Sequence, residues 1–182
     1  MKKTSKRTYL VIIICSILIS AFSLNYAYTL LGGYTKLEVY ISGQTSRLMV
    51  GRSFRGRQTS AEIEKFYIEM RDMVLSQTFP GTLAVVNFQD SSLAPNEISQ
   101  FIGVILEGES AKVPMQYELR EFQCTQKLAI FLTMHPVVMP MASEVEQRLR
   151  FKADSLNIAL GDFIFEIHYP DDSKVIEAWS KN

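Results

Sequence analysis

The chain has 182 residues, an apolar share of 47% and a formal net charge of zero, which fits one globular domain with an appendage. Four of its 19 basic residues lie in the first seven positions, so the remaining 15 face 19 acidic residues and the rest of the chain is acidic. No basic stripe interleaved with aromatic residues is present, so we expect no nucleic-acid partner.

The chain begins with a membrane-like segment. Residues 8–31 contain no charged side chain, and 24 residues in a helix span a hydrocarbon core of about 30 Å. The basic cluster lies before this run, and Lys36 is the next charge after it. By the positive-inside rule we expect a cytoplasmic N-terminus at 1–7, a single-pass anchor at 8–31, a glycine-containing hinge at 32–36 and an extracytoplasmic domain at 37–182.

A cleaved signal peptide is the alternative for the same segment. Asn25-Tyr26-Ala27 is a partial match to a small-residue cleavage site. The apolar run is longer than the roughly 7–15 residues of a signal core, however, and this length favours the uncleaved anchor.

The sequence pattern of the first half of the domain predicts a strand, a helix and two further strands, in that order. Thr59 followed by Glu62 has capping-box spacing, and apolar residues from Ile63 to Val74 then recur at helical spacing. The predicted strands are a flanking edge strand at Leu37–Ile41, then Arg47–Phe54, Leu83–Phe88 and Phe101–Leu106.

The second half repeats this order about 80 residues later. Two candidate strands, Tyr117–Gln123 and Lys127–Met134, precede a proline-containing loop at 135–141. Ser143 with Glu146 predicts a second capped helix, and the strands Phe163–Tyr169 and Val175–Trp179 follow.

This repeat predicts the fold class. We expect an α+β domain built from a duplicated strand-helix-strand-strand module, with an antiparallel sheet, two helices on one of its faces, and one N-terminal transmembrane helix before it. Two facing copies create a cleft between them, which is where a small ligand would bind.

Metal and redox chemistry are not indicated. Cys15 lies in the apolar segment and cannot easily reach Cys124, and no CxxC motif is present. His135 and His168 lack a matching ligand spacing, and the chain has no phosphate-binding glycine motif. We therefore expect no metal and no cofactor.

The order of elements resembles the gyrase-inhibitor-like (GyrI-like) small-molecule-binding family. The segment Leu83–Leu106 is similar to the family's run of strand, acidic turn, proline loop and returning strand, with Gly103-Val104 in the returning strand. Glu166-Ile167-His168 looks like the family's penultimate-strand motif of glutamate, an aliphatic residue and an aromatic one. Anchor, glycine hinge and domain together look most like the membrane-anchored branch of the family.

The resemblance implies a ligand cleft with an acidic residue that meets cationic, aromatic molecules. Glu166 is the matching position, and His168 stands where family members often have tyrosine. On an alternating strand Glu166 and His168 share one face, and Phe163, Phe165 and Ile167 share the other. We expect the Glu166 face to be the open, concave one, with Glu166, His168 and Tyr117 contacting the ligand.

Three functions are compatible with these residues. The favoured one is a membrane-anchored, non-catalytic module that binds a small, cationic or lipophilic molecule. A membrane-tethered adaptor for a protein partner is the second. The third is a hydrolase of small electrophiles in which Glu166 works with Tyr117 or Tyr169; no nucleophile–base pair stands out for it, so we favour a non-enzyme.

Overall fold

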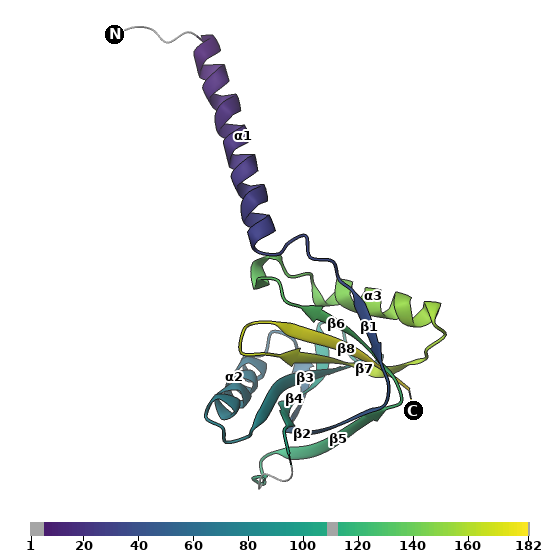
Figure 1. The fold of residues 1–182 in the computed structure, drawn as a ribbon. Helices are drawn as coiled ribbons and strands as arrows, with labels where there is room; N and C mark the ends of the chain where they lie inside the picture. Colours follow the sequence, from purple (N-terminus) through teal and green to yellow (C-terminus); the bar gives the residue numbers. More distant parts are fainter. Residues whose placement is uncertain (1–5, 109–112, 182) are drawn as a thin grey trace. The chain divides into compact units, whose positions relative to one another are not determined.

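A computed structural model describes residues 6–108 and 113–181 (Figure 1). The first five residues, which include part of the predicted basic terminus, lie outside this range. The chain divides into two compact units. One contains residues 6–36 with Met134–Met139, and the other contains Leu37–Thr133 and the residues from Pro140 onward.

The first unit is built on helix α1, Lys6–Leu30. Its segment Thr8–Leu30 is long and apolar enough to cross a membrane, and none of that stretch is buried. The helix ends at Leu30, and Gly32 follows it with a left-handed backbone, φ +81°. There the Leu31 carbonyl accepts a hydrogen bond from the His135 amide at 3.0 Å, which joins the 3₁₀ turn η1, Pro136–Val138, to the helix end.

In the second unit, the described residues form a single sheet of eight strands with two helices. The strands are β1 (Val39–Ser42), β2 (Thr45–Arg57), β3 (Gly81–Phe88), β4 (Glu97–Leu106), β5 (Glu118–Cys124), β6 (Lys127–Leu132), β7 (Leu160–His168) and β8 (Lys174–Ser180). The helices are α2 (Ala61–Leu75) and α3 (Ala142–Ser155).

The strand order shows the internal duplication. It is β1-β6-β8-β7-β3-β4-β2-β5, and all pairings are antiparallel. The modules β2-α2-β3-β4 and β6-α3-β7-β8 place their strands symmetrically about the central β3–β7 pair, and β1 and β5 flank them. The predicted α+β class and duplicated module are therefore confirmed.

The starts of both helices differ from the prediction. The N-cap of α2 is Ser60, not Thr59, and its Oγ accepts a hydrogen bond from the Glu62 amide at 3.3 Å. Helix α3 begins after Met141 without a side-chain cap. Glu146 is instead bonded to Arg150. A capping-box spacing occurs at both places, but at the second one the glutamate is bonded to Arg150, one turn further along the same helix, and to Gln89 in the loop after β3.

Both helices cover the same face of the sheet. Val85, Glu166, Ile176 and Ile130 lie directly opposite one another on β3, β7, β8 and β6, so their side chains share one face. Val85 belongs to the apolar cluster that contains Met70 of α2. Ala142 and Glu146 of α3 line the same cavity as Glu166 and Ile176, so α3 covers this face as well. The prediction of two helices on one face is therefore confirmed.

The other face of the sheet is turned inward. In a flat sheet, β2 and β8 would lie about 19 Å apart, because four strand-to-strand steps of about 4.8 Å each separate them. Yet Arg47 Nη2 of β2 lies 2.9 Å from Glu177 Oε1 of β8. The sheet must therefore curl, and its helix-free face encloses an aromatic cluster, whose buried members include Phe101, Phe165 and Trp179.

Two glycines allow β2 and β4 to approach each other closely. Gly51 and Gly103 are direct partners in the ladder. A Cβ on Gly103 would lie 2.3 Å from the Val50 carbonyl oxygen, and one on Gly51 would lie 2.2 Å from that of Ile102. Backbone atoms cannot yield as a flexible side chain can, so both positions require glycine.

Candidate ligand-binding site

A cavity of about 440 Å³ lies between the two helices, over the centre of the sheet. We call it the inter-helix cavity. Ile63 of α2 and Ala142 of α3 belong to its lining, so the two halves of the domain contribute to one site. The apolar lining residues are Ile63, Ile98, Ala142, Ile164 and Ile176, and the polar ones are Gln58, Asn87, Gln100, Glu146 and Glu166.

Glu166 is the most buried carboxylate in the lining. Its side chain is 20% exposed, and its Oε1 atom lies 2.8 Å from Lys174 Nζ and 3.3 Å from His168 Nε2. The hairpin between β7 and β8 places Lys174 directly opposite His168, which explains why both bases reach the same oxygen. Within the described residues, Oε2 has no hydrogen-bond or ion-pair partner, so one oxygen of Glu166 is available to a ligand.

The surroundings of Glu166 keep it ionised. Burial disfavours the charged carboxylate, but hydrogen bonds and positive charge from His168 and Lys174 outweigh burial and lower the pKa to about 2 from 4.5. A negative charge is therefore present in the wall of the cavity at every physiological pH.

His168 connects the carboxylate to helix α2. Its Nδ1 lies 2.9 Å from the Tyr67 hydroxyl, and the two rings meet edge to face at 5.2 Å. Burial raises the pKa of Tyr67, and the nearby charge of Glu166 raises it further. The neutral hydroxyl is thus fixed between helix and sheet as part of a chain from Tyr67 through His168 to Glu166.

Glu146 supplies the second carboxylate of the cavity, from helix α3. Its Oε1 accepts hydrogen bonds from Arg150 Nε at 2.9 Å and Nη2 at 2.8 Å, and another from Gln89 Nε2. Its Oε2 has no such partner in the described part of the chain. Both carboxylates are thus held in place through one oxygen while the other stays unpaired.

The structure corrects the predicted orientation of Glu166. Glu166 and His168 do share a face, but it is the face that carries the helices. The concave, helix-free face is filled by the aromatic cluster around Phe165 and Trp179. Alternation along the strand showed which residues share a face; it could not show which face the helices cover.

The structure also separates Tyr117 from the other predicted site residues. Tyr117 is buried next to Phe79, with ring centroids 5.6 Å apart, and its hydroxyl donates to Glu69. It is absent from the lining of the inter-helix cavity, whereas Glu166 lines it and His168 supports Glu166. Burial and the hydrogen bond to Glu69 raise the pKa of Tyr117.

Three residues of the site are not evident from the sequence. Tyr67 looks like one more member of the apolar stripe of its helix, Glu146 looks like a capping residue, and Lys174 does not stand out. Lys174 could have been found, because the short turn at Pro170–Ser173 fixes which residues of the two strands face each other. Tyr67 and Glu146 depend on packing between distant segments.

The described residues offer no metal site. Within 6–108 and 113–181, no group of three or more His, Cys, Asp and Glu side chains could hold a metal ion. The described lining of the inter-helix cavity itself consists of two carboxylates, three amide side chains, four isoleucines and an alanine.

Sequence comparison gives no match. No protein-family model matches the chain, and no curated protein does.

Solved structures share its fold. The crystal structure of the EcmrR C-terminal domain matches with a TM-score of 0.55 at 10% identity, over 80% of this chain and 98% of that one. The cryo-EM structure of the EcmrR–DNA complex matches with a TM-score of 0.56 at 9% identity, over 97% of this chain and 70% of that one. SAV2435 bound to tetraphenylphosphonium gives 0.48 at 9% identity, over 81% and 95%. At these identities the likeness to the two EcmrR structures shows the fold alone.

Proposed function

We propose that this protein is a small-molecule-binding module whose ligand is an amphipathic organic cation held in the inter-helix cavity. The observation that carries the proposal is an ionised, largely buried carboxylate, Glu166, in the wall of an otherwise isoleucine-rich cavity. The resemblance to the GyrI-like family and the fold shared with the EcmrR C-terminal domain are consistent with it.

The cavity suits such a ligand in size and chemistry. Its volume of about 440 Å³ lies within the range of small-molecule sites, which are typically apolar with a few polar groups. The isoleucines would contact the apolar part of the ligand. Glu166 Oε2 and Glu146 Oε2 would face its positive charge, and an apolar surrounding strengthens that attraction.

Nucleic acid is not part of this proposal. From the sequence we expected no nucleic-acid partner. One of the similar structures is a DNA complex, so the comparisons do not support that expectation. The described lining of the inter-helix cavity contains two carboxylates and no lysine or arginine, so it presents no cationic side chain of its own to a phosphate group. The site we propose is therefore for a cation.

The test is binding of benzyltrimethylammonium to the purified full chain in detergent, measured by isothermal titration. We expect Glu166→Gln to weaken binding by at least about tenfold, because it removes the charge of the carboxylate while keeping its shape. Glu146→Gln should weaken binding to a smaller extent, since that side chain is more exposed.

Glu144→Gln is the matched control. Glu144 is a surface residue of α3 that pairs with Arg148 at 3.2 Å and does not belong to the lining of the inter-helix cavity. It should leave the affinity unchanged. Unchanged affinity in both Glu166→Gln and Glu146→Gln, with folded protein shown by circular dichroism, would remove the cavity as the cation site.

We also propose that helix α1 anchors the module in a membrane, with the N-terminus cytoplasmic. Its apolar length supports an anchor, and a cleaved signal sequence is the competing possibility. The chain should stay in the membrane pellet after carbonate extraction, and N-terminal sequencing should find the start of the chain intact. A mature chain that begins near Tyr28 would contradict the anchor.

A further inference from the structure

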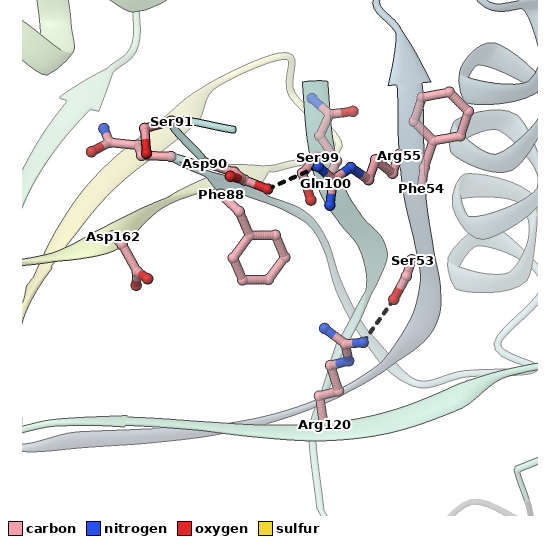
Figure 2. Close-up of a pocket in the computed structure, with 11 residues that line it drawn as sticks. Ser53, Phe54, Arg55, Phe88, Asp90, Ser91, Ser99, Gln100, Arg120 and Asp162 are labelled. Atoms are coloured by element: carbon pink, nitrogen blue, oxygen red, sulfur yellow. Dashed lines mark hydrogen bonds and ion pairs between the residues drawn. The ribbon is translucent and has the colours of Figure 1, made fainter. Parts of the chain in front are cut away.

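A second cavity, of about 600 Å³, lies beside the aromatic cluster of the helix-free face and shares one lining residue, Gln100, with the inter-helix cavity. We call it the polar cleft. Figure 2 shows its lining, which comes from β2, β4 and β5, from the end of β3 and the loop after it, and from the start of β7. Nothing in the proposed function uses this cleft.

Charged groups of both signs line the polar cleft. Arg55 and Asp90 neutralise each other, with 3.3 Å between Nη2 and Oδ2, and Ser92 bonds to both of them. Arg120 and Asp162 are the other two charged residues of the lining.

Arg120 is held in position by its neighbours. Its Nε and Nη2 atoms donate to Glu118 Oε2 at 3.0 and 2.7 Å, and Nη2 also donates to Ser53 Oγ at 2.8 Å. Its guanidinium lies over the Phe101 ring, 4.8 Å from the centroid. Nη1 has no partner among the described residues. A pre-ordered guanidinium with unused N–H donors is suited to a carboxylate.

Asp162 provides the opposite charge. Its backbone carbonyl accepts the Gln89 amide, which fixes this start of β7, but its carboxylate has no partner in the part of the chain that the structure describes. In Figure 2 the Phe88 ring lies between the Asp162 carboxylate and the Arg120 guanidinium. Phe88 is half-buried and packs edge-on against Phe163 at 6.3 Å, so its ring is an ordered apolar surface.

From this arrangement we infer that the polar cleft binds a small zwitterion with an apolar body, of the amino acid or short-peptide class. Arg120 takes the carboxylate, Asp162 takes the ammonium group, and the body of the ligand lies on Phe88. A molecule with only one of these charges makes only one of the two polar contacts and binds less tightly.

Four probes with the same phenylethyl body test this inference. L-Phenylalanine and glycyl-L-phenylalanine carry both charges at two spacings, phenethylamine carries only the ammonium, and 3-phenylpropanoate carries only the carboxylate. We expect at least one zwitterion to bind the full chain, in detergent, at least about tenfold more tightly than either single-charge probe in isothermal titration. Equal affinities for all four, or no zwitterion binding, would overturn the inference.

Two variants assign the charges. Arg120→Gln should weaken the zwitterion and 3-phenylpropanoate but not phenethylamine, whereas Asp162→Asn should weaken the zwitterion and phenethylamine but not 3-phenylpropanoate. Arg148→Gln and Asp154→Asn on α3, outside the polar cleft, are the matched controls and should change nothing. If neither Arg120→Gln nor Asp162→Asn weakens zwitterion binding, the zwitterion binds outside the polar cleft and the inference is wrong.

The same titrations in Glu166→Gln protein separate the two cavities. Phenethylamine is also an organic cation, so in the wild type it could occupy the inter-helix cavity as well. Zwitterion binding should persist in Glu166→Gln, because that residue lines only the inter-helix cavity. If the protein binds a zwitterion but not benzyltrimethylammonium, only the proposed cation site in the inter-helix cavity is rejected. If it binds benzyltrimethylammonium but no zwitterion, only the proposed site in the polar cleft is rejected.

Discussion

Replacing Glu177 with alanine is expected to lower the free energy of unfolding by about 3–5 kcal/mol, because it leaves buried charges unpaired. Glu177 is 3% exposed. Its Oε1 accepts hydrogen bonds from Arg47 and Lys127, both at 2.9 Å, and its Oε2 accepts the Trp179 Nε1–H at 2.9 Å. Without the carboxylate, two cations that are themselves about 15% exposed would remain on the inner face of the curled sheet.

Urea denaturation of the full chain in detergent measures this effect. Glu144→Ala removes a glutamate from an exposed pair on α3, so it should cost no more than about 1 kcal/mol and is the matched control. A variant that replaces Arg47 and Lys127 by methionine and Glu177 by leucine should recover much of the loss, since apolar residues can substitute for a buried ion network. Equal losses for Glu177→Ala and Glu144→Ala would show that the network is not needed.

The stability that Glu166 contributes should disappear in acid. Its folded-state pKa of about 2 lies below the ordinary value of 4.5, so the folded state binds this proton less readily than the unfolded state. The contribution is therefore complete above about pH 5 and is lost as the pH falls from 4.5 to 2. The shift corresponds to about 3 kcal/mol at 1.36 kcal/mol per pKa unit.

Comparing thermal unfolding of the wild type and Glu166→Gln between pH 6 and pH 2 isolates this contribution. The wild type should lose roughly 10 °C of Tm relative to the variant across this range, because all other groups titrate in both proteins. Glu144→Gln should show no comparable pH-dependent difference from the wild type. A Tm difference between wild type and Glu166→Gln that stays constant from pH 6 to pH 2 would contradict an ionised, paired Glu166.

Local patterns in the sequence predicted the elements of the fold well. Strands that alternate or run apolar, such as Leu83–Phe88 and Phe101–Leu106, lie within β3 and β4. The edge strand at Leu37–Ile41 corresponds to β1, which pairs with β6 at the sheet edge. The helix starts were less accurate, because adjacent Thr59 and Ser60 can both cap, and only the backbone geometry selects Ser60.

The ligand-binding roles of Glu166, His168 and Tyr117 stay predictions. Glu166 lines the inter-helix cavity and His168 contacts it, and their two-residue spacing on a strand is sufficient reason for that contact. Tyr117 does not join them. Tyr67 and Glu146 come from the two helices, and their positions depend on how each helix packs on the sheet. No local pattern contains that information.

By itself, the sequence determined the duplicated α+β module, the long apolar N-terminal helix and the residues that share a face on each strand. These features follow from periodicity, turn residues and length, which act over a few residues. Tertiary structure alone decided which face the helices cover: they cover the face of β7 that carries Glu166 and His168, whereas the more apolar face, with Phe165 and Ile167, is buried by the curl of the sheet. Alternation along a strand does not distinguish these two ways of burying a face. The curl of the sheet brings Glu177 next to Arg47, which is 130 residues away in the sequence, and largely buries both. Glu166 lies on the opposite face and lines the cavity between the helices.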